Sequence, residues 1–183
     1  MYERQQAPSR YSLPEPYPEV RVTAKNRFYA QLLLEDYASE TSELDAINQY
    51  LYHSFRFKQW NLGDLAELEE GISIIEMRHM EMLAELILKL GGDPRYWVIR
   101  DNDQRYYSTS SVYYGHSVLD MLSADIEAER IAIVNYRRHA GMINDPYVRA
   151  VINRIVRDEE YHLQLFSEAY QRYRSTAPDK AQR

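Results

Sequence analysis

Two short stretches decide the fold of this chain: residues 76–79 read EMRH and residues 159–162 read EEYH. Both match Glu-x-x-His, and no other stretch of the 183 residues does. Each lies in a segment whose apolar residues recur every three or four positions, which predicts an amphipathic helix. Because residues i and i+3 share one face of a helix, the Glu and the His of each stretch can approach one metal ion together.

A second motif precedes each of these stretches. Residues 43–50 read ELDAINQY and residues 129–136 read ERIAIVNY, so both match Glu-x-x-Ala-Ile-x-x-Tyr. The two motifs occur in the same order in both halves of the chain, which predicts two related helical hairpins. Glu43 and Glu129 then supply one carboxylate from each remaining helix. Four Glu and two His inside a bundle are typical of di-iron and di-manganese carboxylate proteins.

The apolar periodicity predicts four long helices and an all-α fold. Asp64 suits the N-cap of the second helix, and Pro146 suits the first position of the fourth. Residues 93–115 are long enough to connect opposite ends of a bundle, so we expect two hairpins joined by a long crossover. The helices are expected at residues 23–56, 64–90, 116–142 and 146–173.

The segments outside the bundle are short. Residues 1–22 contain four prolines and are expected to form an extended arm, suited to wrapping a neighbour. Residues 174–183 are expected to be a flexible tail. The bundle itself is then residues 23–173.

The faces of the predicted helices distinguish between nearby carboxylates. Glu129 lies on the apolar stripe of the third helix, whereas Glu127 falls two residues off it, so Glu129 is chosen and Glu127 is the alternative. A buried carboxylate is costly unless it is paired or bound to metal, which supports an inward site. Glu40 lies one turn before Glu43 on the inner stripe. It is an extra ligand, a proton relay or an ion-entry group, or else a polar residue near the bundle end.

The amino-acid composition excludes several kinds of active site. The chain has no cysteine, which excludes disulfides, thiolate catalysis and Cys-ligated zinc or iron–sulfur centres. Carboxylate and imidazole ligands suit iron or manganese, and zinc could also bind. The net charge of −6 without a long basic cluster argues against nucleic-acid binding. No secretory signal or membrane-spanning stretch is recognisable, so a cytoplasmic protein without membrane partners is expected.

These motifs resemble those of the ferritin-like superfamily, and of bacterioferritin and rubrerythrin in particular. Residues 42–92, SELDAINQYLYHSFRFKQWNLGDLAELEEGISIIEMRHMEMLAELILKLGG, resemble the first hairpin of bacterioferritin, and residues 157–162, RDEEYH, resemble its fourth-helix motif. The resemblance covers about residues 30–92 and 117–172. It implies metal ligands at Glu43, Glu76, His79, Glu129, Glu159 and His162.

The resemblance also implies residues that support the ligands. Tyr50 matches the tyrosine beside the metals, with Tyr136 as its repeat partner, and Asp158 matches an acid that orients a ligand histidine. Ile75 occupies the corresponding position before Glu76, so one histidine is expected to lack this support. Met77 stands where bacterioferritin has its haem-ligating methionine. Helix packing is the favoured role of Met77, so haem is not expected.

The remaining histidines, His53, His116 and His139, have no ligand-like spacing and are expected at the surface or at helix ends.

The resemblance implies an oxidoreductase that uses two iron or two manganese ions on hydrogen peroxide or O₂, by peroxidase-type or ferroxidase-type chemistry. Iron storage or metal handling in a shell of many subunits, manganese-catalase-like activity, and a structural protein with a vestigial site are the alternatives. Rubrerythrin's rubredoxin module needs cysteines that this chain lacks, so any electron donor would be a separate partner. A homo-oligomer, at least a dimer, is expected.

Overall fold

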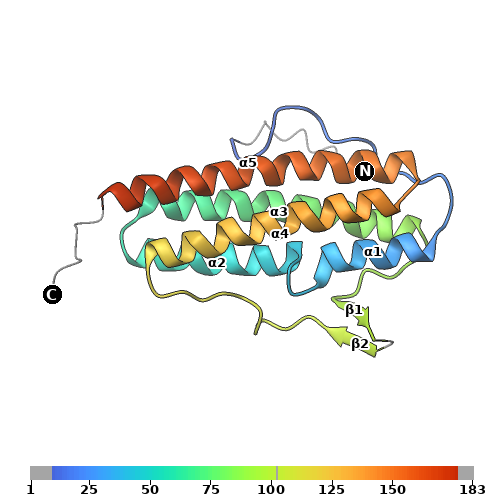
Figure 1. The fold of residues 1–183 in the computed structure, drawn as a ribbon, viewed down its shortest axis with the longest axis horizontal. Helices are drawn as coiled ribbons and strands as arrows, with labels where there is room; N and C mark the ends of the chain where they lie inside the picture. Colours follow the sequence, from blue (N-terminus) through green and yellow to red (C-terminus); the bar gives the residue numbers. More distant parts are fainter. Residues whose placement is uncertain (1–9, 102, 177–183) are drawn as a thin grey trace.

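A computed structural model describes residues 10–101 and 103–176 as a bundle of long helices with a small β-hairpin at its side (Figure 1). Helices α1 and α2 follow one another along the bundle and together form one of its four rods (Figure 1). The predicted four-helix bundle is therefore confirmed. None of the described helices is long and apolar enough to cross a membrane. The elements are α1 (Arg27–Ala38), α2 (Glu43–Gln59), α3 (Gly63–Lys89), β1 (Trp97–Arg100), β2 (Asp103–Tyr106), α4 (Val118–Met142) and α5 (Pro146–Thr176).

The first rod is broken, so the single helix predicted for residues 23–56 is wrong. Ser39 and Ser42 both have extended backbone and separate α1 from α2. The Ser42 hydroxyl donates to the Ser39 carbonyl at 2.7 Å and accepts from the Asp45 N–H at 3.4 Å. Serine side chains compete with helical hydrogen bonds in this way. The break places Glu43 in the first turn of α2.

The predicted N-cap of the second long helix also needs correction. Helix α3 begins at Gly63 and has no side-chain N-cap, because Asp64 lies inside its first turn and accepts a hydrogen bond from Tyr173 at 2.7 Å. The crossover contains a small β-hairpin, in which β1 and β2 pair antiparallel with Trp97 opposite Tyr106. The fourth helix does begin at Pro146, as predicted.

The described part of the N-terminal arm, residues 10–22, lies on the bundle of its own chain. Arg154 of α5 donates to the carbonyl oxygens of Leu13 and Glu15 at 2.8 to 3.1 Å. The Tyr11 ring packs on α3 at Gly71, where an added Cβ would lie 2.0 Å from a ring carbon. Glycine at this position therefore lets the arm approach the helices closely.

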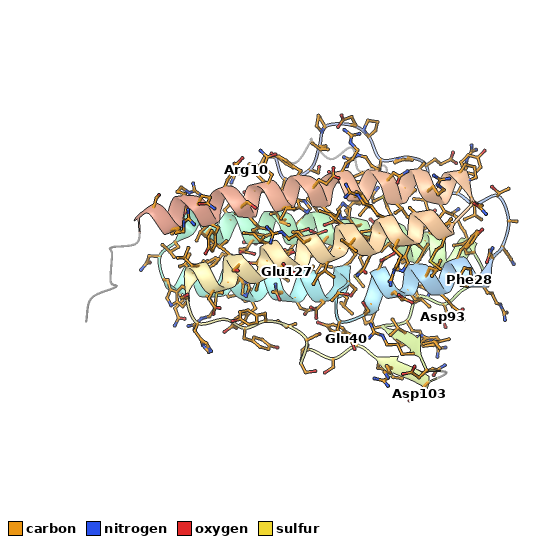
Figure 2. The ribbon with its side chains drawn as sticks, viewed as in Figure 1. Arg10, Phe28, Glu40, Asp93, Asp103 and Glu127 are labelled. Atoms are coloured by element: carbon orange, nitrogen blue, oxygen red, sulfur yellow. The ribbon has the colours of Figure 1, made fainter. Side chains whose placement is uncertain are left out.

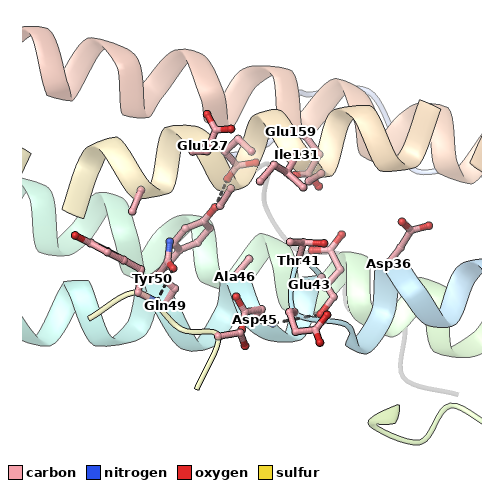
Figure 3. A pocket seen from close by; sticks show the side chains of 18 of the residues that line it. Asp36, Thr41, Glu43, Asp45, Ala46, Gln49, Tyr50, Glu127, Ile131 and Glu159 are labelled. Atoms are coloured by element: carbon pink, nitrogen blue, oxygen red, sulfur yellow. Dashed lines mark hydrogen bonds between the residues drawn. The ribbon is translucent and has the colours of Figure 1, made fainter. Parts of the chain in front are cut away.

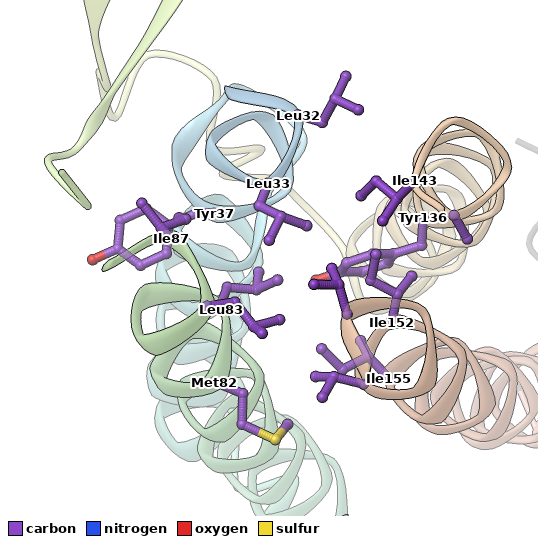
Figure 4. Close-up of a cluster of buried hydrophobic side chains, with 14 of the residues drawn as sticks. Leu32, Leu33, Tyr37, Met82, Leu83, Ile87, Tyr136, Ile143, Ile152 and Ile155 are labelled. Carbon is purple, nitrogen blue, oxygen red and sulfur yellow. The ribbon is translucent and has the colours of Figure 1, made fainter. Parts of the chain in front are cut away.

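Two apolar clusters fill the bundle and leave a polar layer between them. On α3, Leu65 and Ile72 belong to one cluster, whereas Leu83 and Leu86 belong to the other. On α5 the same change of cluster occurs between Val156 and Phe166. Figure 4 shows the second of these clusters, in which side chains from α1, α3, α4 and α5 converge. The two Glu-x-x-His motifs lie between the clusters on both helices.

Candidate metal centre

The six predicted ligands meet in this polar layer, and each is at most 4% exposed. Their ligand atoms form two overlapping groups, within each of which the atoms lie within 4.8 Å of one another. Glu76 and Glu159 belong to both groups, so their carboxylates are placed to bridge two ions. The first group adds Glu43 and His79, and the second adds Glu129 and His162.

Both imidazoles turn Nδ1 toward the carboxylates. His79 Nδ1 lies 2.8 Å from Glu76 Oε2 and 3.0 Å from Glu159 Oε1. His162 Nδ1 lies 2.8 Å from Glu76 Oε1. Despite these short distances, three of the buried atoms, Glu76 Oε1, Glu159 Oε1 and His162 Nδ1, make no well-formed hydrogen bond among the described residues. Buried polar atoms rarely lack a hydrogen bond, and cations bound between these three atoms would interact with all of them. The residues therefore fit a pair of metal ions.

The Nε2 atoms of both imidazoles contact groups that lie outside the six-ligand centre. His79 Nε2 lies 3.2 Å from Asp158 Oδ2, and His162 Nε2 lies 2.8 Å from the carbonyl oxygen of Tyr11. A proton on each Nε2 leaves the Nδ1 lone pair free for a metal. As expected from Ile75, only one of the two histidines has a carboxylate behind it, because Asp158 contacts His79 of the other hairpin. At His162 a backbone carbonyl of the arm takes the place of the acid.

Asp158 is itself fixed as an anion. Its Oδ1 lies 2.7 Å from Arg154 Nη1 and accepts from the Leu13 N–H at 2.9 Å, and its Oδ2 accepts from the Tyr17 hydroxyl. Burial alone would raise its pKa, but the hydrogen bonds from His79, Arg154 and Tyr17 outweigh burial and hold the pKa below its usual range. An ionised carboxylate therefore faces His79.

The two predicted tyrosines connect the hairpins. Tyr50 of α2 donates to Glu129 Oε1 of α4 at 2.7 Å, and Tyr136 of α4 donates to Glu43 of α2. Burial, followed by the charge of the carboxylate it faces, raises the pKa of each phenol well above its usual value. Each hydroxyl therefore keeps its proton and orients a carboxylate that belongs to the other half of the chain.

The centre brings four carboxyl groups and two imidazoles together in a buried space. Burial and the neighbouring carboxylates Glu159 and Glu76 raise the pKa of both Glu43 and Glu129 well above the usual range. Burial alone would lower the pKa of His162, but the charge of Glu76 and the nearby carboxylate of Glu159 raise it to about 10. Without bound metal, these carboxyl groups and the imidazole therefore keep protons that bound cations would displace.

A cavity of about 230 Å³ leads to the centre between α2 and α4 (Figure 3). Its lining runs from the exposed residues Glu40 and Glu127 to the buried carboxylates of Glu43, Glu129 and Glu159. The small side chains of Ala46, Ala128 and Ala132 also line it, which leaves space for a small molecule.

The two alternative carboxylates are exposed; Figure 2 labels Glu127 on α4 and Glu40 beside the break between α1 and α2. Glu127 is exposed and lies 3.6 Å from Arg130. Glu40 lies in the break between α1 and α2, with its side chain 52% exposed and 3.0 Å from Arg100. The expectation that Glu40 lies on the inner stripe is therefore wrong, and an additional ligand there is excluded. Its place at the cavity rim is compatible with ion entry.

Two histidines expected at the surface or at helix ends are buried inside the bundle instead. His53 contacts Asp125, and His139 contacts Asp36, from helices that the sequence gives no reason to pair. A signal was present, because both follow a repeat tyrosine by three residues. His116 is exposed, as expected. Met77 is also exposed, on α3.

A helical bundle that gathers four glutamates and two histidines has the architecture of the carboxylate di-metal proteins. The ferritin-like domain matches residues 36–175, and the chain belongs to the ferritin family.

Manganese catalases and bacterioferritins are among the proteins that the chain resembles. The chain is 32% identical over 181 residues to a probable manganese catalase of Clostridium acetobutylicum, covering 88% of this chain and 79% of that protein. It is 34% identical over 128 residues to a bacterioferritin of Mycobacterium leprae, covering 67% of this chain and 73% of that protein. The crystal structure of wild-type KatB, a manganese catalase from Anabaena, superposes with a TM-score of 0.79 at 25% identity, covering 91% of this chain and 82% of that one.

Proposed function

We propose that this chain binds two manganese ions at the six buried ligands and disproportionates hydrogen peroxide. Two molecules of peroxide give two of water and one of O₂, so the reaction balances without a further electron donor. The observation that carries the proposal is the pair of overlapping ligand groups at the end of a cavity sized for a small molecule. The likeness to manganese catalases over most of the chain supports manganese over iron.

In this proposal each hairpin holds both ions. Glu76 and Glu159, which belong to both ligand groups, would contribute to holding both ions, Glu43 and His79 would hold one, and Glu129 and His162 would hold the other. The bound ions would supply redox centres that accept electrons from one peroxide and return them to another. Tyr50 and Tyr136 keep the outer carboxylates oriented through their hydroxyl protons. The alanines of the cavity wall give peroxide room to reach the carboxylates.

The direct test of this proposal is O₂ release from peroxide by the metal-free protein after loading with Mn²⁺ or Fe²⁺. We expect rapid O₂ release with manganese and much less with iron. Rapid oxidation of added Fe²⁺ by O₂, without O₂ release from peroxide, would contradict the proposal.

Iron storage is the second candidate, and the bacterioferritin matches support it. Storage requires a closed shell of many subunits, whereas peroxide disproportionation does not. We propose a cytoplasmic homo-oligomer of at least two copies. Light scattering distinguishes the candidates, because a dimer or a small oligomer has no interior in which to store iron.

The cavity predicts the route by which peroxide reaches the metal ligands. Ala128→Leu is expected to lower kcat/KM for peroxide several-fold with unchanged manganese content, because the larger side chain fills the passage to Glu129. Steady-state O₂ release and metal analysis measure the two quantities. Ser123→Leu, on the exposed side of the same helix, is the matched control and should change neither. Equal rates in both variants would show that peroxide enters elsewhere.

A further inference from the structure

A second buried cluster lies outside the six-ligand centre. It consists of His53 of α2, Glu69 of α3 and Asp125 of α4, each 0% exposed. One ligand atom from each lies within 4.8 Å of the other two. Glu69 precedes Glu76 by two helical turns and Asp125 precedes Glu129 by one. The cluster therefore lies farther along the bundle, toward the end at which α4 begins (Figure 1).

The imidazole of this cluster is held like those of the centre. His53 Nε2 lies 2.8 Å from the carbonyl oxygen of Tyr113 in the crossover, the natural acceptor for an Nε2–H. Its Nδ1 lies 2.9 and 3.0 Å from the two oxygens of Asp125. With one proton on Nε2, the Nδ1 lone pair points at a carboxylate, an arrangement that needs a cation or a second proton between them.

Glu69 gives the second, independent observation. Both of its carboxylate oxygens are buried and have no hydrogen-bond partner among the described residues. Among the ion pairs of residues 10–101 and 103–176, no Lys or Arg reaches Glu69 or Asp125. Burial and the charge of Asp125 raise the pKa of Glu69 well above its usual range. Such a carboxylate either shares a proton with Asp125 or faces a cation.

We propose that His53, Glu69 and Asp125 bind a third divalent transition-metal ion, separate from the pair. Two carboxylates balance the charge of one such ion, and a set of two oxygen donors and one imidazole suits Mn²⁺, Fe²⁺ or Zn²⁺.

Gln49 gives the site a fixed geometry. Gln49 Nε2 donates to Asp125 Oδ1 at 2.9 Å, and Gln49 Oε1 accepts from the Tyr113 N–H at 3.0 Å. The peptide groups of Tyr113 therefore hold both His53 and the amide that orients Asp125. Outer hydrogen bonds of this kind position metal ligands.

The other half of the chain supplies a natural control. His139 occupies the repeat position of His53 and lies 2.8 Å from Asp36, so a buried His–Asp pair is present there too. The repeat position of Glu69, however, is Ile152, which belongs to an apolar cluster. A carboxylate equivalent to Glu69 is thus missing at that position, and we propose no metal there.

The test is metal content per subunit after saturation with Mn²⁺ and removal of free metal. Wild type is expected to retain one ion more than Glu69→Gln, a nearly isosteric change that removes one carboxylate. His53→Gln should lose the same ion, and His139→Gln should match the wild type. Far-UV circular dichroism of each variant confirms that it is folded.

A version with the six-ligand centre disabled keeps this test independent of the proposed function. In a Glu159→Ala background, the third site should still bind one ion, and adding Glu69→Gln should remove it. Equal metal content with and without Glu69→Gln in both backgrounds would overturn the proposal. Glu69 would then be a neutral acid that shares its proton with Asp125.

Discussion

Replacement of Glu159 by alanine is expected to abolish peroxide turnover while the bundle stays helical. Glu159 belongs to both ligand groups, with Oε1 3.0 Å from His79 Nδ1 and Oε2 3.7 Å from His162 Nδ1. Its loss removes a ligand from both ions, so turnover should fall by more than about 100-fold, the upper range for losing an outer hydrogen-bond partner. The apolar clusters on either side do not depend on it. O₂ release, manganese content and far-UV circular dichroism report the three quantities.

Glu160→Ala is the matched control for this variant. Glu160 is the next residue on α5, but it is exposed and pairs with Arg137 at the surface. It should retain both metal and turnover. A Glu159→Ala protein that turned over peroxide at the wild-type rate would count strongly against the ligand assignment.

Asp158→Asn is expected to weaken metal binding unequally at the two positions. Asp158 faces His79, whereas His162 is held by the Tyr11 carbonyl, so only one imidazole loses its anionic partner. Such a loss costs about 10- to 100-fold in metal affinity. Titration of the metal-free protein with Mn²⁺, followed by electron paramagnetic resonance, should show one weakened and one unchanged site of the pair.

The control for Asp158→Asn is Tyr17→Phe. This change removes the hydrogen bond to Asp158 and the long, 3.4 Å contact of the hydroxyl with His79 Nε2, but it keeps the charge of Asp158 and its contact with Arg154. Its effect on metal affinity should be much smaller. Equal weakening of both positions by Asp158→Asn would contradict the assignment of this carboxylate to His79 alone.

The sequence predicts much of this architecture because helical spacing is local. Glu76 and His79 share a helix face whatever the tertiary arrangement. The second Glu-x-x-His motif, at Glu159 and His162, indicates another helix that faces the first. Which residues approach one another across the bundle is not local. The partners of His53 and His139 come from other helices at no fixed spacing, so the repeat tyrosine three residues before each histidine marks the pair but does not identify its partners.

Two other features escaped prediction for different physical reasons. The break after Ala38 interrupts a segment whose apolar spacing continues on both sides, and local serine hydrogen bonds decide it. The support of His162 comes from a backbone carbonyl in a proline-rich arm. Every residue has such a carbonyl, so no residue type could have marked Tyr11 in advance.

The exchange of hydrogen bonds between Tyr50, Glu129, Tyr136 and Glu43 is the contact that two identical hairpins would make across a two-fold axis. In such a symmetric pair every substitution would appear twice. Joining the hairpins in one chain removes that constraint, so each half can differ from the other. At equivalent positions of the two halves, Asp158 corresponds to Ile75 and Glu69 corresponds to Ile152. Such differences between the halves are possible because each half has its own sequence within one chain. The covalent link between the halves thus permits an asymmetric interior within a nearly symmetric frame.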